Sequence, residues 1–399
     1  MPERVQKGQG TMRAFTFENA TKIYFGGGCV KEHLLEAVKP YGETVMLAYG
    51  GGSIKTNGIY QEVMDVLKLA GKQVIEFSGI MPNPTYSKVM EGKKVVQENQ
   101  VDLILAVGGG SVMDCSKAIS MAAATDKDVW EEYWIKKGEI DFEPVPVGVI
   151  VTVVGTGSEV NGEGVITHEE QKIKTSRNYP RCNPVFAMMD PKYTYTVSPL
   201  QTAAGGFDML SHVMETYFSA PDEDNLSDAI SEALMRSIIA NLPVAIREPE
   251  NYEARSNLMW ASTMAEIGII KLGKQCDFEA HMIEHQMGAY TDCNHGMGLG
   301  VIHPAYYRRI CRDGIKKFVK FAVNVWGMSP DGGEEELAFG GIDALQAFIH
   351  EIGLPGTLRE LGITDQSLLK TIADSCIRND GGYRQLTHAE ILDILEECY

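Results

Sequence analysis

The sequence predicts an α/β N-terminal half built on a parallel sheet and an all-α C-terminal half. Between residues 44 and 190, apolar runs of strand length alternate with helix-length segments, and from residue 198 onward the pattern is helical nearly throughout. Apolar strands that lack polar alternation and are separated by helices are typical of a parallel sheet covered on both faces. We therefore expect a tail at 1–11, an α/β domain at 12–196 and an all-α domain at 197–399.

Each expected element follows from a local pattern. The strand candidates are 44–49, 73–77, 102–107, 145–154 and 185–190, and a short hairpin is expected from 164–167 and 173–176. Apolar residues at helical spacing predict helices at 59–70, 89–97 and 112–124. In the second half, helix starts are expected at Ser198, Ser227 and Thr364-Asp365.

Composition narrows the class of protein. The chain has 399 residues, enough for about two domains, and its 54 acidic and 36 basic residues give a formal charge of −18. This charge disfavours nucleic acid and anionic membranes as partners. Eight cysteines without a CxxC motif favour reduced thiols, and the sequence contains neither a run of about 20 apolar residues nor a signal-peptide pattern. A cytoplasmic protein is expected.

Three glycine loops follow predicted strands, at 50–53, 108–111 and 155–158. Gly108-Gly109-Gly110-Ser111 stands between a buried strand and a helix, where backbone N–H groups and the helix N-terminus accept a phosphate. A tight turn is the simpler interpretation of any one such loop. Three of them at the carboxyl ends of parallel strands indicate a ligand site, in this case for a dinucleotide.

The first loop bears on the choice of cofactor. NAD-selective sites place a carboxylate after an early strand, where it binds the ribose 2′-hydroxyl. Here the chain has Gly51, Gly52, Ser53 and Lys55 instead, which suit a 2′-phosphate. The sequence favours NADP(H) over NAD, with a capping role for Ser53 and a solvated Lys55 as the alternative.

Five polar residues have the spacing of a metal site. Asp208 and His212 are one helical turn apart, as are His281 and His285, and His295 follows after the turn at 291–294. Two helices and a loop could bring these side chains to one ion, and an Asp/His set without thiolate suits Fe2+, Zn2+ or Mn2+. A lone histidine is usually structural, but an unpaired carboxylate among the apolar neighbours of Asp208 would be costly, which favours a cation partner for it.

A second interpretation competes for the same segment. His281-Met282-Ile283-Glu284-His285 matches the HxxEH motif of zinc metallopeptidases, in which the glutamate is the general base. The motif is short and would leave the glycine loops without a role. We retain a metallopeptidase only as a remote alternative.

The motifs together resemble those of a known family. GGGSVMDCSK (108–117), VGTGSE (154–159), GFDMLSHVMET (206–216) and HMIEHQMGAYTDCNHGMGLG (281–300) are similar, in this order, to the iron-containing, group III alcohol dehydrogenases. The NADPH-dependent butanol dehydrogenases of that family are the most similar. The resemblance covers residues 12 to 399.

The resemblance implies a role for each residue of the site. It places metal ligands at Asp208, His212, His281 and His295, with Fe2+ favoured and Zn2+ or another divalent ion as alternatives. It makes His285 a catalytic proton-relay residue beside the nicotinamide. The implied cofactor contacts are Gly51, Gly52, Ser53, Lys55, Gly109, Gly110, Ser111, Asp114, Thr152, Thr156, Asn161 and Lys174.

The predicted activity is hydride transfer between NADP(H) and a primary alcohol or aldehyde such as butanol or butanal. The alternatives with the same architecture are a polyol dehydrogenase of the glycerol type and a lyase resembling dehydroquinate synthase. A metal-storing or NADP-sensing protein without activity is a further alternative. The predicted partners are a small-molecule substrate and a second copy in a homodimer, without nucleic acid or membrane.

Overall fold

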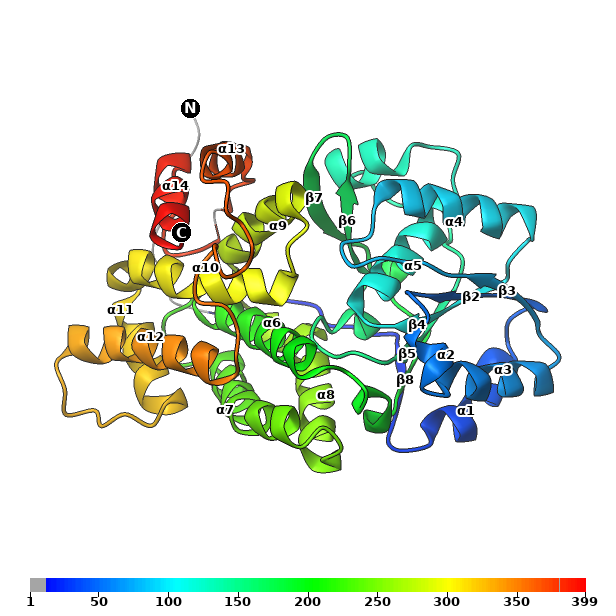
Figure 1. The fold of residues 1–399 in the computed structure, drawn as a ribbon, viewed down its shortest axis with the longest axis horizontal. Helices are drawn as coiled ribbons and strands as arrows, with labels where there is room; N and C mark the ends of the chain where they lie inside the picture. The colour runs from blue at the N-terminus through cyan, green and yellow to red at the C-terminus, as the bar shows by residue number, and fades with distance from the viewer. Residues whose placement is uncertain (1–11, 380) are drawn as a thin grey trace.

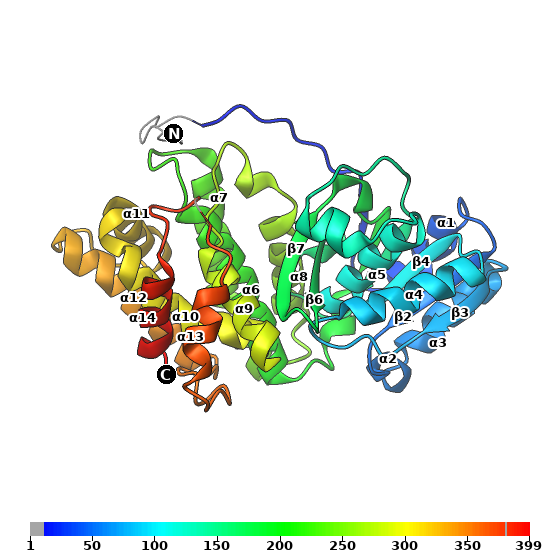
Figure 2. The ribbon, with the colours of Figure 1, turned by 90° about the horizontal axis from the view of Figure 1, so that it is seen from above.

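The computed structural model describes residues 12–379 and 381–399, so the predicted tail at 1–11 lies outside the described residues. An α/β part and a helical part lie side by side along the longest axis of the molecule (Figures 1 and 2). The predicted fold class is confirmed. The last strand of the sheet ends at Met189, and the first α-helix of the helical part begins at Pro199.

The sheet has six parallel strands in the order β1-β8-β5-β4-β2-β3. The bounds are β1 Lys22–Phe25, β2 Thr44–Tyr49, β3 Gln73–Phe77, β4 Leu103–Gly108, β5 Val147–Val151 and β8 Phe186–Met189. Strand β1 was not predicted, because it is only four residues long, none of them is fully buried, and it lies at the edge of the sheet beside β8. The central strands β2, β4 and β5 are the nearly continuous apolar runs seen in the sequence.

Helices cover both faces of the sheet (Figure 1). Helices α1 Cys29–Val38 and α3 Ile59–Leu69 pack on one face, and α4 Tyr86–Glu98 and α5 Gly110–Ala123 pack on the other. Successive residues of β4 contribute to opposite cores: Ile104 belongs with α4 and α5, and Leu105 with α1 and α3. A short helix, α2 Ser53–Thr56, follows the first glycine loop.

The predicted hairpin is present as β6 Glu163–His168 and β7 Ile173–Asn178, paired antiparallel. It leaves the main sheet, and β7 packs against helix α9 of the helical part. Figure 2 shows this hairpin between the two parts of the molecule. Its position brings the side chains of β7 to the boundary between the sheet and the helices.

The second half is helical, as predicted. Its helices are α6 Pro199–Tyr217, α7 Leu226–Arg247, α8 Tyr252–Glu266, α9 Glu279–Thr291, α10 His295–Ile310, α11 Ile315–Lys320, α12 Glu334–Glu351, α13 Leu368–Ser375 and α14 His388–Glu397. Short 3-10 or π segments occur at Trp130–Ile135, Ser158–Val160, Pro180–Cys182, Pro191–Thr194, Ile269–Lys271, Cys311–Asp313 and Phe321–Val325.

Two of the three predicted helix starts differ from the observed ones. Ser198 caps α6 as expected, through its side chain and the Gln201 N–H. Asn225 rather than Ser227 caps α7, because its side chain accepts from the Asp228 N–H. Asp365 accepts from the Ser367 N–H in a turn, and α13 begins only at Leu368.

Among the described residues, α7 alone is long and apolar enough to cross a membrane by length and composition. In the structure it packs against α6 and α8 and contains Pro243. This test is also met by core helices of globular proteins.

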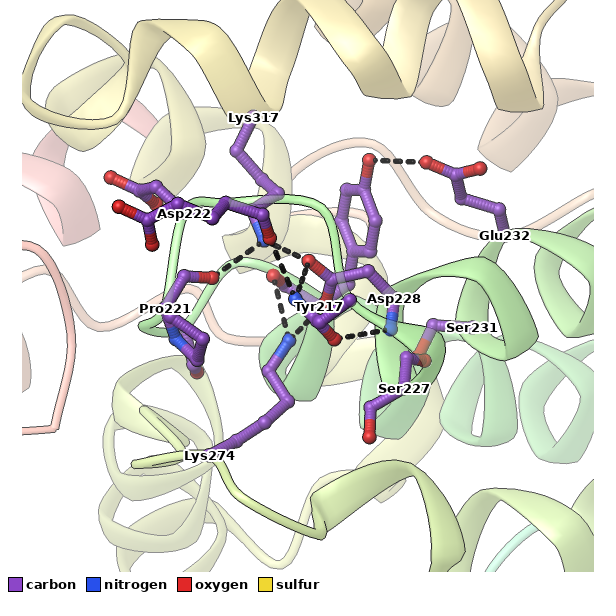
Figure 3. Close-up of polar contacts among 12 residues, drawn as sticks. Tyr217, Pro221, Asp222, Ser227, Asp228, Ser231, Glu232, Lys274 and Lys317 are labelled. Carbon is purple, nitrogen blue, oxygen red and sulfur yellow. Dashed lines mark hydrogen bonds and ion pairs between the residues drawn. The ribbon is translucent and has the colours of Figure 1, made fainter. Parts of the chain in front are cut away.

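A buried ion-pair cluster joins three segments of the helical part (Figure 3). The Asp228 carboxylate, in the first turn of α7, accepts from both Lys274 and Lys317, whose side chains are fully buried. Lys317 also donates to the Pro221 carbonyl at 3.0 Å, and Lys274 to the Tyr217 carbonyl at 3.3 Å. The cluster therefore fixes the segment that precedes α9 against α7 and α11.

Candidate active site

One cleft of about 810 Å³ lies between the sheet and the helices. Its walls include parts of all three glycine loops and the histidines of the predicted metal site. The predicted site residues that line it are Gly51, Gly52, Ser53, Gly109, Gly110, Ser111, Asp114, Thr152, Thr156, Asn161, Lys174, Asp208, His212, His281, His285 and His295. Of the predicted set, Lys55 does not line the cleft.

Lys55 turns toward the end of strand β3 instead. Its ammonium lies 2.9 Å from a carboxylate oxygen of Glu76 and over the rings of Tyr49 and Tyr60. Both tyrosine hydroxyls also donate to Glu76. These hydrogen bonds from Tyr49, Tyr60 and Lys55 lower the pKa of Glu76 to about 2, so a carboxylate that the sequence analysis did not consider stands beside the first loop and is neutralised by Lys55.

The second and third loops pack closely against each other. A Cβ atom at Gly110 would lie 2.4 Å from the Thr156 side chain, so only glycine allows the start of α5 to approach the third loop this closely. The N-terminus of α5, with Gly109 as its N-cap, opens on the cleft. Its first N–H groups can bind an anion there.

Asp114 and Lys117 on α5 organise the third loop from behind. Asp114 accepts from the Ser158 hydroxyl and, at 3.1 Å, from the Val165 N–H. The buried Lys117 ammonium donates to backbone and side-chain oxygens of Ser158 and Asn161. The Asp114 carboxylate thus already has protein partners, which suits a residue that shapes the wall of the cleft.

The candidate metal ligands converge from three helices. Asp208 and His212 lie on α6, His281 on α9, and His295 is the first residue of α10. The expectation of two helices and a loop was wrong at His295, because Asn294 caps α10 immediately before it. Asp208 Oδ1 lies 3.8 Å from His212 Nδ1, 3.8 Å from His281 Nε2 and 3.5 Å from His295 Nε2.

These atoms fit a metal cation. Asp208 Oδ1, His212 Nδ1 and His281 Nε2 are buried and have no hydrogen-bond partner among the described residues. Buried polar atoms without partners are costly unless a ligand satisfies them. Burial alone would raise the pKa of Asp208, but the histidines hold it below its usual range, so the carboxylate is charged. One carboxylate and three imidazole nitrogens suit a borderline divalent metal.

Two glutamates that the sequence analysis did not assign as supports orient the ligand histidines. Glu215 on α6 accepts from His281 Nδ1 and, at 2.8 Å, from the Ala280 N–H. Glu284 on α9 accepts from His295 Nδ1. Glu215 could have been found from spacing, because positions 208, 212 and 215 follow one face of a helix over two turns.

His285 and Lys174 complete the wall near the candidate ligands. His285 Nδ1 is buried without a partner among the described residues, and the ring lies 5.5 Å from that of His295. Burial and the nearby cationic groups hold the pKa of His285 well below its usual value, so the imidazole is neutral. Lys174 reaches from β7 to Glu284, with 3.2 Å between Nζ and Oε2.

The metallopeptidase interpretation was wrong. Its general base, Glu284, is fully buried, does not line the cleft and is bound by both Lys174 and His295. A general base must reach the reacting water. Glu284, His285 and His295 also form a compact group, but Glu284 and His295 Nδ1 are already hydrogen-bonded to each other. The partner-free atoms around Asp208 are the better metal site.

The cleft is lined by glycine loops at the carboxyl ends of a parallel sheet and faces an Asp/His cluster on helices. This combination defines the class of metal-dependent oxidoreductases that use a dinucleotide. The family description "Iron-containing alcohol dehydrogenase" matches residues 20–191, and "Fe-containing alcohol dehydrogenase family, C-terminal" matches residues 202–399. The chain belongs to the iron-containing alcohol dehydrogenase family. The predicted family and the predicted general activity, an alcohol dehydrogenase, are confirmed.

Named relatives cover nearly the whole chain. The chain is 37% identical to NADH-dependent butanol dehydrogenase A of Clostridium acetobutylicum, over 97% of this chain and 100% of the relative. It is 34% identical to the NADPH-dependent aldehyde reductase YqhD of Escherichia coli, over 97% and 99%. The solved NADH-dependent butanol dehydrogenase A of Thermotoga maritima is 33% identical, with a TM-score of 0.91 over 97% and 99%. The coenzymes in these names are divided between NADH and NADPH.

Proposed function

We propose that the protein interconverts primary alcohols and aldehydes such as butanol and butanal with NADP(H), using a divalent metal held by Asp208, His212, His281 and His295. The observation that carries this proposal is the set of partner-free ligand atoms in the same cleft as the three glycine loops. Family membership and the butanol dehydrogenases among the relatives support the substrate class. Fe2+ is the favoured metal, with Zn2+ as the alternative.

A bound divalent metal would supply Lewis-acid polarisation of the substrate oxygen, and a nicotinamide would give or take the hydride. The chain contributes the positions of the reactants. Glu215 and Glu284 hold the rings of His281 and His295 in fixed orientations, which keeps the ligand nitrogens aimed at one point. Asp208 adds the negative charge that retains a cation there.

His285 is proposed as the proton-relay residue. Its ring lies in the cleft wall beside His281 and His295, and its free Nδ1 is neutral and able to accept a proton. Lys174 is proposed to lie near the nicotinamide, anchored by Glu284. The phosphates are proposed to bind at Gly109, Gly110 and Ser111, with Asp114, Thr152, Thr156 and Asn161 shaping the pocket around them.

The preference for NADP(H) over NAD(H) rests on the first loop. Gly51, Gly52 and Ser53 offer backbone N–H groups and a hydroxyl to a 2′-phosphate. The Lys55–Glu76 pair behind the loop is neutral overall, so it does not repel a 2′-phosphate. Lys55 remains a proposed contact of the 2′-phosphate. To make this contact, its ammonium would have to leave Glu76.

A cytoplasmic homodimer remains the proposed state of the protein. Edge strand β1 has a neighbouring strand on one side only. Its residue Phe25 packs against Trp260, and the two side chains remain 41% and 42% exposed. An edge strand with exposed aromatic side chains suits contact with a second copy. Sedimentation of the purified protein measures the assembly directly.

The function is tested by incubating protein purified without chelators with butanal and either NADPH or NADH. Oxidation of the cofactor, followed at 340 nm, is expected, with NADPH the better substrate. Elemental analysis should find one iron or zinc per chain. Absence of turnover with either cofactor would contradict the proposal, and a lyase or a metal-storing protein would give that result.

Two variants separate metal binding from proton transfer. His281→Ala should lose the metal and the activity together, because it removes a ligand. His285→Ala should keep the metal and lose rate. Stoichiometric metal in the His281→Ala protein would show that the ligand assignment is wrong.

A further inference from the structure

The cleft has a charged region that the proposed reaction of an alkyl substrate does not use. Glu163 at the start of β6, Glu266 at the end of α8 and Lys271 in the 3-10 segment after it all line the cleft. These three residues form an acidic corner, in which two carboxylates and one ammonium give a net charge of −1. An alkyl chain packed against them would remove water from charged groups and replace none of its hydrogen bonds.

The charged forms of these three groups stabilise one another. Lys271 Nζ lies 2.7 Å from Glu266 Oε2. Burial would lower the pKa of Lys271, but Glu266 and Glu163 raise it above its usual value. Burial would also raise the pKa of Glu163, but Lys271 and the Ser176 hydroxyl hold it below its usual range. The single ammonium therefore acts on both carboxylates, and one negative charge of the acidic corner is left uncompensated.

The Phe278 ring connects the acidic corner to the candidate metal ligands. Its centroid lies 5.3 Å from that of His281 and 6.2 Å from that of His212. Lys271 Nζ stands over the same ring, 4.8 Å from the centroid. The acidic corner is therefore about one aromatic ring away from the ligand histidines, within reach of the far end of a short substrate.

The acidic corner also has an acceptor atom without a donor. The Glu266 side chain is 3% exposed, and its Oε1 has no hydrogen-bond partner within the described part of the chain, although Oε2 binds Lys271. A buried carboxylate oxygen without a donor costs free energy unless a ligand supplies one. Glu266 lines the cleft, so a ligand in the cleft can supply that donor.

The position of Glu266 is rigid. A Cβ atom at Gly157 would lie 2.4 Å from Glu266 Cβ, so the third glycine loop packs directly on this side chain. One turn earlier on α8, the Ser262 hydroxyl accepts from the N–H groups of Gly155 and Gly157. The free carboxylate oxygen is thus held in place by the same loop that is proposed to bind the cofactor.

The charge and the free acceptor together select a chemical group. A carboxylate on the substrate would be repelled by the uncompensated negative charge, and a methyl group has no donor for Glu266 Oε1. A hydroxyl can donate to that oxygen but leaves the charge uncompensated. A primary ammonium has three donors and no acceptor, and it brings the charge of the acidic corner to zero. Lys271 repels it with one charge, but two carboxylates attract it.

A metal at the candidate ligands would not reverse this balance. The two positive charges of a divalent ion are offset by the Asp208 carboxylate and by Glu215, which holds His281. The metal site is then close to neutral. The charge that the far end of a substrate meets is therefore set by the acidic corner.

We infer that Glu163, Glu266 and Lys271 form a subsite for a protonated primary amine at the far end of the substrate, so that the preferred substrates are amino alcohols and the corresponding amino aldehydes. This inference rests on the proposed alcohol dehydrogenase function and adds the substrate class. It assigns Glu163 and Glu266 as specificity-determining residues of this chain.

The test compares alcohols of matched length in the oxidative direction, in which the alcohol loses a hydride to NADP+ and a proton to water. 4-Amino-1-butanol, 1-pentanol and 1,4-butanediol have the same number of heavy atoms and differ in the end group. For the metal-loaded protein, kcat/KM should be about tenfold higher for the amino alcohol than for 1-pentanol, the effect of one hydrogen bond to a charged group. The diol, per hydroxyl end, should fall between them, and 4-hydroxybutanoate should be the poorest.

Three variants test the charges separately. Glu163→Gln and Glu266→Gln each remove one negative charge and keep the shape of the side chain. Each should bring the ratio of kcat/KM for 4-amino-1-butanol over 1-pentanol toward one, mainly through a higher KM for the amino alcohol. Lys271→Met removes the opposing charge and should keep or raise this ratio. Wild-type ratios in both glutamine variants, or a lower ratio in Lys271→Met, would overturn the inference.

A matched control is Glu36→Gln, which removes an exposed carboxylate paired with Lys39 at the end of α1. It should leave the ratio unchanged, and thermal unfolding of every variant checks that folding is preserved. A second readout does not depend on turnover. In metal-free wild type, 4-amino-1-butanol should raise the unfolding temperature more than 1-pentanol, because the acidic corner binds the amine without the metal. Equal shifts would contradict the subsite.

The two proposals fail differently. If the wild type oxidises 1-pentanol or the diol as well as 4-amino-1-butanol, the amine subsite is refuted and the dehydrogenase function stands. If it oxidises the amino alcohol and not 1-pentanol, the subsite is supported in its strongest form. If it oxidises none of these alcohols with either cofactor, both proposals fall.

Discussion

Glu215 illustrates how a single residue outside the candidate ligand set can decide metal binding. It holds His281 through Nδ1 and leaves Nε2 free to face Asp208. We expect Glu215→Gln to weaken metal affinity about 10- to 100-fold, because the ring loses its charged acceptor. Competition with a chromogenic chelator measures this affinity.

The control for Glu215 is Glu232→Gln on α7, which removes a charged acceptor for the Tyr217 hydroxyl at 2.8 Å and the Asn324 side-chain amide at 2.9 Å, away from the candidate ligands. Its metal affinity should equal that of the wild type. Equal affinities in all three proteins would show that Glu215 has a purely structural role.

Glu76 offers a residue-level test of cofactor choice. In Glu76→Gln, Lys55 loses its charged partner and can turn toward the first loop. We expect the ratio of kcat/KM for NADPH over NADH to rise several-fold, since a freed ammonium attracts a 2′-phosphate. Steady-state assays at fixed butanal measure the ratio.

Lys55→Met provides the opposite change and should lower the same ratio by leaving Glu76 unneutralised beside the loop. Glu98→Gln, at the exposed end of α4, should change neither kinetic constant. If Glu76→Gln and Lys55→Met leave the ratio at the wild-type value, the pair has no part in cofactor choice.

The site could be predicted from sequence only where its residues share a helix face or a motif. Asp208 and His212 are one turn apart, and the glycine loops follow recognisable strands. Lys174 and Glu284 are far apart in sequence and meet only because β7 packs against α9. The partner of Lys55 was missed for a similar reason, because Glu76 reaches it through the pairing of β2 with β3.

Among the elements, the strands that lie at the centre of the sheet were the most predictable. Strand β4 is buried on both faces, so its composition is apolar throughout and its limits are sharp. Strand β1 is an edge strand that carries lysine and tyrosine, which removes the apolar signal. Helix starts depended on which neighbouring polar residue served as the cap, and Asn225 and Ser227 are chemically similar candidates.

The start of α7 depends on the ion-pair cluster drawn in Figure 3. Asp228→Asn would leave Lys274 and Lys317 buried without a carboxylate. We expect a loss of about 3–5 kcal/mol in the free energy of unfolding, the cost of breaking a buried pair by removing one partner. Urea unfolding followed by far-UV circular dichroism measures the change.

Asp224→Asn is the matched control, because Asp224 is 96% exposed and pairs with Lys320 at the surface. It should cost less than about 1 kcal/mol. If the two variants unfolded at the same urea concentration, the buried cluster would contribute no more than a surface pair.

At the scale of the whole molecule, a metal held by the candidate ligands would join three helices that already meet through packing and through the hydrogen bonds of Glu215 and Glu284. Asp208, His281 and His295 come from α6, α9 and α10, and their ligand atoms lie within 4.8 Å of one another. A ligand that binds only the folded state adds about 4 kcal/mol when present at 1,000 times its dissociation constant. Chelation should therefore lower the unfolding temperature by several degrees, and restored metal should reverse the change.

Chelation also tests whether the metal site and the cofactor site act independently. The glycine loops belong to the sheet and the ligands to the helices, so metal-free protein should bind NADPH with an affinity within about twofold of the loaded protein, as expected when the phosphate contacts and the ligand atoms lie on different elements. Titration of NADPH fluorescence measures this affinity. Asp208→Asn serves as the control, since its unfolding temperature should not respond to metal. A large loss of NADPH affinity on chelation would instead show that the Lys174–Glu284–His295 contacts couple the cofactor site to the metal site across the cleft.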